Sequence, residues 1–232
     1  MYISKLPLNS ARRGAMELIA SPNKMHAAVE HAFPPREESG PAEGRILWRL
    51  DVAPRGSEDI WLYVVSPDKP DFTHICERAG WPTLGTWETK DYAPLLDRIA
   101  DDQAWSFRLK ANPVRKVSQD LGTQKNENVV GKIQGHVTEE QQLKWLLSRC
   151  EEHGFSVASD NTGAPAVRLS QRGKGAFLHK GSHVTLTTVV YDGTLVVLDA
   201  ERFRRTLCYG MGRAKGFGCG LLTVAPVQAI SR

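Results

Sequence analysis

The chain has 232 residues, enough for one large domain or two of roughly 100 residues each, and its 41% hydrophobic content is sufficient for a core. No apolar run approaches the roughly 18 residues that span a bilayer, and the N-terminus has no apolar signal-peptide region, so we expect a cytoplasmic protein with no membrane partner. The four cysteines contain no C-x-x-C pair, which argues against a zinc knuckle or a disulfide framework.

Positive charge is concentrated in the second half of the chain. Residues 1–100 carry 12 Lys and Arg against 14 Asp and Glu, whereas residues 101–232 carry 18 against 12. No acidic residue lies between Asp160 and Asp192, and none follows Glu201. These acid-free stretches favour a polyanionic partner, although a solvated surface is the alternative. Their cations are Arg168, Arg172, Lys174, Lys180, Arg202, Arg204, Arg205, Arg213, Lys215 and Arg232.

The first half is predicted to run strand, helix, two strands, helix, strand. A strand at 2–8 precedes a helical segment opened by Asn9. A second helix begins at Ser21-Pro22 and runs to about Phe33, because Ser suits the N-cap and Pro the first helical position. Strands at 45–52 and 60–66 form a hairpin, and a weaker helix near 92–100 leads to a strand at 105–111. On this last strand Arg108 and Lys110 alternate with apolar residues, so one face is cationic.

The second half repeats a similar order of elements after a linker-like stretch at 112–137. Thr138-Glu-Glu-Gln141 is a capping box that opens a helix ending at Gly154. Strands are expected at 155–159 and 166–171, then at 184–190 and 194–198 around an Asp192-Gly193 hairpin turn, and at 220–225 after a helix at 200–208. This order predicts an α+β protein of two tandem ferredoxin-like folds with antiparallel sheets. We place an N-terminal domain at 1–113, a linker at 114–137 and a C-terminal domain at 138–232.

A glycine-rich stretch near the C-terminus, Gly210-Met-Gly-Arg-Ala-Lys-Gly-Phe-Gly-Cys-Gly220, is typical of a phosphate-binding loop. Its glycines let the backbone approach a ligand and present N–H groups, and Arg213 and Lys215 add charge. A dinucleotide-binding fingerprint does not fit, because no helix pattern and no acidic residue follow. A P-loop does not fit either, because Lys215 is not followed by Ser or Thr. A purely structural glycine-rich loop is the open alternative.

His26 stands out among the seven histidines by its position on the helix that Ser21 opens. The apolar stripe of that helix contains Met25 and Val29, which leaves His26 on another face, near a helix N-terminus that favours phosphate. A surface or structural histidine is the ordinary alternative. We predict no metal site, since His26 and His31 lie about 140° apart around the helix.

Taken in order, these segments resemble the CasE family of type I-E CRISPR-associated endoribonucleases, the Cascade subunits that cut precursor crRNA at repeat hairpins. The resemblance covers nearly the whole chain. It is carried by Met1-Tyr-Ile-Ser-Lys-Leu-Pro-Leu-Asn9, Ser21-Pro-Asn-Lys-Met-His-Ala-Ala-Val-Glu-His-Ala-Phe-Pro34, Gly44-Arg-Ile-Leu-Trp-Arg-Leu-Asp51, Phe107-Arg-Leu-Lys-Ala-Asn-Pro113, Gly131-Lys132, Trp145-Leu146 and the glycine-rich loop.

The resemblance implies two tandem RAMP-type ferredoxin-like folds and a cut that needs no metal or cofactor. The family's catalytic histidine falls on His26, which would act as general acid or base while the ribose 2′-oxygen attacks the adjacent phosphate. The products would be a 2′,3′-cyclic phosphate and a 5′-hydroxyl. Histidine suits this role because its unperturbed pKa of about 6.5 allows proton transfer near neutrality. The implied partners are the CRISPR repeat hairpin, the mature crRNA and other Cascade subunits.

Two positions depart from the family pattern. Some relatives have a tyrosine where this chain has Asn23, which cannot exchange a proton, so a second proton-transfer group is unassigned. The family often has Arg after Gly-Lys, and here Ile133 follows Lys132.

The expected RNA contacts are the cations and the glycine-rich loop, since duplex RNA is recognised largely through its shape and backbone. The alternatives are a catalytically silent RNA-holding subunit and a binder of small nucleotides. The residues predicted to contact RNA are Asn23, Lys24, Arg108, Lys110, Arg115, Lys116, Lys132, Arg168, Arg172, Lys174, Lys180, Gly210, Gly212, Arg213, Lys215, Gly216 and Gly218.

Overall fold

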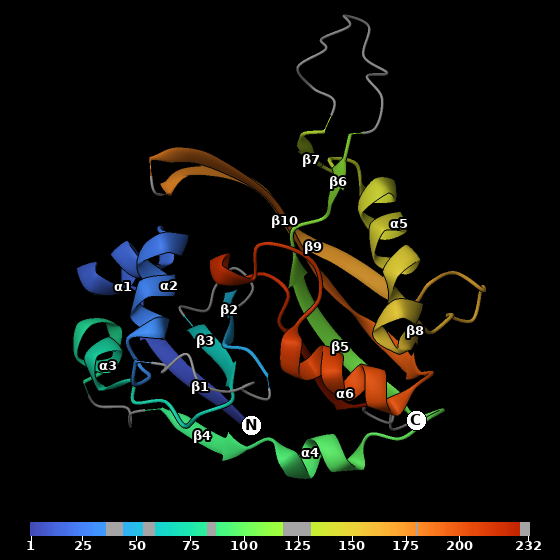
Figure 1. Cartoon of the computed structure of the whole chain (residues 1–232), viewed down its shortest axis with the longest axis horizontal. Helices are drawn as coiled ribbons and strands as arrows, with labels where there is room; N and C mark the ends of the chain where they lie inside the picture. The colour runs from blue at the N-terminus through green and yellow to red at the C-terminus, as the bar shows by residue number, and fades with distance from the viewer. Residues whose placement is uncertain (36–43, 53–58, 83–86, 118–130, 180, 228–232) are drawn as a thin grey trace, which may run out of the picture.

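The computed structural model describes residues 1–35, 44–52, 59–82, 87–117, 131–179 and 181–227. Two antiparallel sheets lie side by side, and helices cover one face of each (Figure 1). The predicted α+β class with tandem ferredoxin-like folds is confirmed. No helix within the described ranges is long and apolar enough to cross a membrane.

The first half contains a four-stranded sheet in the order β2-β3-β1-β4. Strand β1 pairs antiparallel with both β3 and β4, which is the arrangement of a ferredoxin-like fold. The elements are β1 (Tyr2–Asn9), α1 (Arg13–Ile19), α2 (Pro22–Glu30), β2 (Leu47–Val52), β3 (Asp59–Ser66), α3 (Thr73–Ala79) and β4 (Glu88–Asp91). The predicted hairpin is confirmed as β2 and β3, whereas α3 and β4 were not predicted.

The second half repeats this arrangement in the order β11-β5-β10-β8, and β9 pairs with β10 as an additional strand. Strands β6 and β7 form a separate ribbon within the stretch expected to be a linker. The elements are α4 (Ala93–Arg98), β5 (Ala104–Ala111), β6 (Val114–Lys116), β7 (Ile133–Gly135), α5 (Glu139–Cys150), the 3-10 turn η2 (Glu151–His153), β8 (Phe155–Val157), β9 (Val167–His179), β10 (Ser182–Val197), α6 (Ala200–Tyr209), the 3-10 turn η3 (Lys215–Phe217) and β11 (Leu222–Pro226).

Strand β5 belongs to the second sheet, which differs from the expected division at residue 113. It pairs with β10 and β11, so it is the first strand of the second ferredoxin-like fold. The fourth strand of the first fold is instead β4, a short and mostly exposed strand with no apolar alternation to reveal it. The first sheet therefore ends at Asp91, and α4 connects the two halves (Figure 1).

The predicted hairpin turn at Asp192-Gly193 is wrong, because β10 runs without a break through both residues. Gly193 pairs with Phe107 on one side and with Val167 on the other. A Cβ at Gly193 would lie 2.4 Å from the carbonyl oxygen of Ala166, so a close strand approach explains this glycine. The real connection lies between β9 and β10, which form a long arm that reaches toward α1 and α2 (Figure 1).

Two helix starts follow the predicted caps, whereas the helix expected to open at Asn9 begins at Arg13 and has no side-chain capping hydrogen bond. The Ser21 hydroxyl accepts a hydrogen bond from the backbone N–H of Lys24, and the Thr138 hydroxyl accepts one from Gln141 at 3.2 Å. Strand β5 alternates as expected, with Phe107 and Leu109 buried and Arg108 and Lys110 half-buried. These local signals place α2 and β5, the two elements that carry the predicted histidine and strand cations.

Each half has its own hydrophobic core, and β2 contributes to both. Trp48 packs in the core of the first half, while Leu47 packs in the core of the second. The neighbouring Arg49 is 2% exposed and donates to the carbonyl oxygens of Arg108 and Leu221 in the second half. The two halves are therefore joined by shared packing and by a buried hydrogen-bonded cation.

Candidate functional site

His26 lies on the surface of α2, as the helical stripe predicted. Met25 and Val29 are fully buried, whereas 35% of the His26 side chain is exposed. The Ser21 cap and Pro22 at the first turn set the start of this helix and therefore the direction in which His26 points.

The structure brings His26 and the glycine-rich loop together across the two halves. The His26 ring and the Phe217 ring of η3 meet edge to face, with centroids 6.5 Å apart. A Cβ placed on Gly216 would lie 3.5 Å from His26 Nε2. Since Gly216 and Phe217 belong to the second half and His26 to the first, this contact forms only when the halves are packed as observed.

The two nitrogens of the His26 ring have different surroundings. Nε2 faces Gly216, whereas Nδ1 is buried and has no hydrogen-bond partner among the described residues. The Oε1 atom of Glu30, one helical turn further on, lies 3.8 Å from Nδ1. This distance is within ion-pair range but beyond an ordinary hydrogen bond.

The arm formed by β9 and β10 packs over the same place. Asn23 donates from Nδ2 to the carbonyl oxygen of Leu178 near the tip of the arm, at 2.5 Å. The Phe177 ring contacts the Phe217 ring with centroids 4.9 Å apart. Asn23 therefore holds the arm, and an aromatic chain runs from Phe177 through Phe217 to His26. Sequence reasoning missed both phenylalanines, although an aromatic inside a glycine-rich loop is an available signal.

Part of the glycine-rich loop is explained by packing against protein. Gly218 is buried at φ +76°, and a Cβ there would lie 2.6 Å from the Trp48 ring. Gly210 is buried too, and its Cβ would lie 2.9 Å from Leu47. At these two positions, glycine is needed for packing against the protein itself, which is the structural alternative that the sequence left open. Gly216 differs, since it borders the His26 ring.

The loop cations differ in their surroundings. Arg213 is exposed, whereas Lys215 is half-buried, and burial together with the nearby charge of Arg45 lowers the pKa of Lys215. A Cβ at Gly212 would lie 3.1 Å from the Trp145 ring of α5. Arg213 is therefore the loop cation with the freest access to a ligand.

Two of the predicted RNA-contacting arginines already have protein partners. Arg108 donates from Nε to Asp192 at 2.5 Å and lies 3.5 Å from Asp51, and the hydrogen bond with Asp192 is the main cause of its raised pKa. Arg172 donates to the Gln142 side chain at 2.9 Å and to the Val137 carbonyl oxygen at 2.7 Å. Arg108 therefore connects β5 to β10 and to β2 of the first half, whereas Arg172 joins elements of the second half.

The other predicted cations lie on three surfaces. Two of these are the β6–β7 ribbon and β9 in the second half, and the third is α2 in the first half, while Lys110 lies on β5 of the second sheet. Exposed positions are Lys24, Arg115, Lys116, Lys132, Arg168 and Lys174, while Lys110 is half-buried. Lys180 lies outside the described residues.

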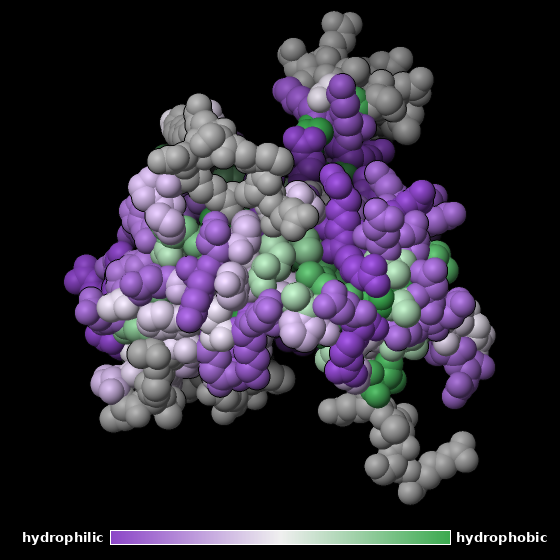
Figure 2. Space-filling model, turned by 60° about the horizontal axis from the view of Figure 1, so that its bottom comes forward, coloured by the Kyte–Doolittle hydropathy of each residue, from purple (hydrophilic) through white to green (hydrophobic). Residues whose placement is uncertain are grey.

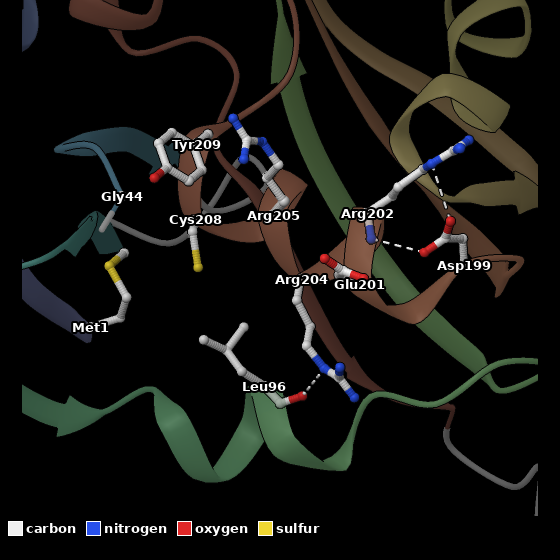
Figure 3. Close-up of a pocket in the computed structure, with 10 residues that line it drawn as sticks. All are labelled: Met1, Gly44, Leu96, Asp199, Glu201, Arg202, Arg204, Arg205, Cys208 and Tyr209. Atoms are coloured by element: carbon white, nitrogen blue, oxygen red, sulfur yellow. Dashed lines mark hydrogen bonds and ion pairs between the residues drawn. The ribbon is translucent and has the colours of Figure 1, made fainter. Parts of the chain in front are cut away.

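A separate basic pocket of about 550 Å³ lies beside α6 (Figure 3). Its arginines have partners: Arg204 donates to the carbonyl oxygens of Leu96 and Ile99, and Arg205 lies 4.9 Å from the ring centroid of Tyr209. Arg202 contacts Asp199 at the helix start. The Arg204 contacts fix α6 against α4 and the other two lie within α6 and its cap, so the pocket is a weaker candidate than the surroundings of His26.

A further pocket of about 490 Å³ is lined by residues of β2, β3, β5, β9 and β10, among them Arg108 and Arg168, but Arg108 is already paired there with Asp192. The face turned forward in Figure 2 is mostly hydrophilic, with a small group of hydrophobic residues between the halves. Within the described ranges, no three His, Cys, Asp or Glu side chains are grouped so that they could hold a metal ion. The His26 surroundings are therefore the best candidate site.

Comparisons with known proteins agree on one family. A family model described as CRISPR associated protein matches residues 1–226. The CRISPR-associated endoribonuclease Cse3 of Thermus thermophilus is 32% identical over 97% of this chain and 100% of that protein. The Cascade subunit CasE of Escherichia coli (strain K12) is 24% identical over 98% of this chain and 100% of that protein. A solved structure of CRISPR endoribonuclease Cse3 bound to a 19-nucleotide RNA has a TM-score of 0.79 and 31% identity, covering 97% of this chain and 100% of that chain.

Proposed function

The chain belongs to the CRISPR-associated protein family, and from that premise we propose that it is an endoribonuclease that cuts precursor crRNA at repeat hairpins. It then keeps the mature crRNA as a subunit of Cascade. The observation that carries the proposal is the contact of His26 with the glycine-rich loop across the two halves. The names of the two relatives, an endoribonuclease and a Cascade subunit, support it.

The proposed reaction is transfer of the phosphate to the neighbouring 2′-oxygen. The 2′-hydroxyl loses its proton as its oxygen bonds to phosphorus, and the bond from phosphorus to the 5′-oxygen breaks while that oxygen gains a proton. The products are a 2′,3′-cyclic phosphate and a 5′-hydroxyl. His26 performs one of these two proton transfers as general acid or base, through the Nε2 atom that faces Gly216.

Asn23 does not supply the second proton transfer, because an amide does not titrate. Its side chain is instead engaged with the Leu178 carbonyl oxygen, which supports a role in holding the arm. Asn23 therefore contributes to RNA binding through the position of the β9–β10 arm.

Phosphate binding is assigned to the exposed cations around this site. Arg213 lies in the glycine-rich loop, Arg168 and Lys174 lie on β9, and Arg115, Lys116 and Lys132 lie on or beside the β6–β7 ribbon. Cations spread over several elements suit a duplex read through its backbone. The absence of a metal requirement and the cytoplasmic location stay predictions.

The nuclease assignment is tested with a labelled repeat hairpin in EDTA. We expect cleavage by the wild-type protein, loss of cleavage with His26→Ala, and unchanged cleavage with His74→Ala. His74 is a suitable control because it is an exposed histidine on α3 that contacts the backbone of α2 at Ala28. A silent RNA-holding subunit would bind the hairpin and leave it intact, and cleavage that survives His26→Ala would remove His26 from the mechanism.

A further inference from the structure

Glu30 is the carboxylate placed to orient the His26 ring. It follows His26 by four residues on α2, and this spacing puts the two side chains on the same face of the helix. Its Oε1 atom lies 3.8 Å from His26 Nδ1, and 46% of the Glu30 side chain is exposed. A partly exposed glutamate has rotamers available, so a small rotation brings the two atoms to hydrogen-bond distance.

The need for a partner at this atom comes from the burial of Nδ1. The atom is shielded from solvent and has no hydrogen bond within the described part of the chain. A buried polar atom without a hydrogen-bond partner costs free energy, so a hydrogen bond from Nδ1–H to the carboxylate one turn away is favourable. Glu17 of the neighbouring helix α1 is held by Arg78 and Lys24.

The opposite edge of the ring faces the glycine-rich loop. Nε2 points toward Gly216, and the Phe217 ring meets the imidazole edge to face. A proton held on Nδ1 leaves the Nε2 lone pair free, whereas a proton on Nε2 would block it as a base. The partner of one ring nitrogen thus decides what the other nitrogen can do.

We propose that Glu30 is a positioning residue that holds the Nδ1–H form of His26 and directs Nε2 at the RNA, an inference that rests on the proposed catalytic role of His26. As a base, neutral His26 accepts the 2′-hydroxyl proton at Nε2. As an acid, the charged ring gives its Nε2 proton to the 5′-oxygen. In both cases Nδ1–H stays bonded to Glu30, and the carboxylate stabilises the positively charged ring.

The test uses Glu30→Gln and Glu30→Ala with Glu77→Gln as the matched control. Glu77 is an exposed glutamate on the neighbouring helix α3. The first measurement is the tautomer of His26, read from the imidazole ¹⁵N shifts of protein labelled with ¹⁵N-histidine and assigned with a His26→Gln variant. The second is the single-turnover cleavage rate at saturating repeat hairpin in EDTA, together with the dissociation constant of that hairpin.

We expect Glu30→Ala to lose the Nδ1–H signature and to cleave more slowly, on the order of 10-fold, the scale of one charge-assisted hydrogen bond. Glu30→Gln keeps an acceptor oxygen and loses only the charge, so it should also cleave more slowly, but by a smaller factor. Hairpin affinity should hold or increase, because a negative charge is removed beside a polyanion. A merely structural role would instead change affinity and stability together.

An unchanged tautomer in Glu30→Ala, or an unchanged cleavage rate in Glu30→Gln, would overturn the positioning role. Cleavage by His26→Ala at the wild-type rate would overturn the catalytic role of His26, and a hairpin left intact by the wild-type protein would overturn the proposed function, so these failures are distinguishable. Glu30→Gln is isosteric and exposed, so it also gives a result if Glu30→Ala destabilises α2.

Discussion

Arg49 of the first sheet donates from Nη1 to the carbonyl oxygen of Leu221 in the second half, at 3.1 Å. Its Nε and Nη2 atoms form a paired contact with the Asp51 carboxylate at 2.7 and 2.9 Å. The Arg49 side chain is almost completely buried, so this charge is stabilised by its partners alone. The contact between His26 and the glycine-rich loop depends on halves that are held together in this way.

We expect Arg49→Ala to lower the free energy of unfolding by about 3 to 5 kcal/mol, because it removes the donor of two carbonyl oxygens and the closest partner of the Asp51 carboxylate. Urea unfolding measures the change. Arg13→Ala is the control, since the Arg13 side chain is 93% exposed and its pair with Glu17 should contribute about 0 to 1 kcal/mol. Equal losses in the two variants would contradict a buried clamp.

Two glycines of the same loop should respond differently to alanine. Gly218→Ala forces a Cβ to 2.6 Å from Trp48 at a φ of +76°, and we expect a loss of about 2 to 4 kcal/mol in unfolding free energy. Gly216→Ala places its methyl group at an ordinary contact distance from the His26 ring, 3.5 Å, so stability should change by less than about 0.5 kcal/mol.

The Gly216→Ala methyl group nevertheless lies against Nε2, where the RNA has to approach. Single-turnover cleavage of the repeat hairpin should therefore slow by roughly 10-fold or more. Cleavage at the wild-type rate in Gly216→Ala would mean that RNA reaches His26 from another side.

His153 should make stability depend on pH below neutrality. Burial is the main cause that lowers its pKa, Lys215 and Arg149 add to the effect, and Glu152 opposes it. The neutral ring is bonded to the Thr206 hydroxyl at 2.9 Å. Because the folded pKa is depressed, this stabilisation is complete above the unfolded pKa of about 6.5 and is lost as pH falls through the lower folded value.

Urea unfolding between pH 7.5 and 5 tests the effect. The His153→Gln variant should show a shallower decrease in unfolding free energy than the wild-type protein over this range, since glutamine keeps a polar side chain but does not titrate. Parallel pH curves for the two proteins would exclude His153 as a source of acid sensitivity.

Local signals account for the elements that the sequence predicted well. The caps at Ser21 and Thr138 act within one turn, and the alternation of β5 depends on its own residues. The hairpin turn predicted at Asp192-Gly193 was wrong because the turn preference of this dipeptide is also a local signal. Pairing with β5 on one side and with β9 on the other keeps β10 extended there. Tertiary pairing outweighed dipeptide preference at this position.

In the candidate site, too, local features were predicted from the sequence and long-range contacts were not. The helical stripe of α2 was enough to place His26 outward, and the glycine-rich loop was visible from composition. Their contact through Phe217, and the partners that occupy Arg108 and Arg172, join segments far apart in the chain. A single sequence carries no signal for such pairs, because an arginine in the sequence is equally consistent with a free surface cation and with one that is bonded to a distant side chain.

Neighbouring cations on β9 provide the test of RNA binding. Lys174 is exposed, so Lys174→Ala should leave stability within about 0.5 kcal/mol and reduce the slope of log affinity against log salt by about one. Arg172 instead bonds Gln142, whose side chain is buried, so Arg172→Ala should destabilise the fold by about 1 to 3 kcal/mol. Hairpin binding is measured from 50 to 300 mM salt, and stability by urea unfolding. A normal salt slope in Lys174→Ala would place the RNA away from this face of the arm, and an unchanged stability in Arg172→Ala would show that its contacts with α5 are not needed for folding.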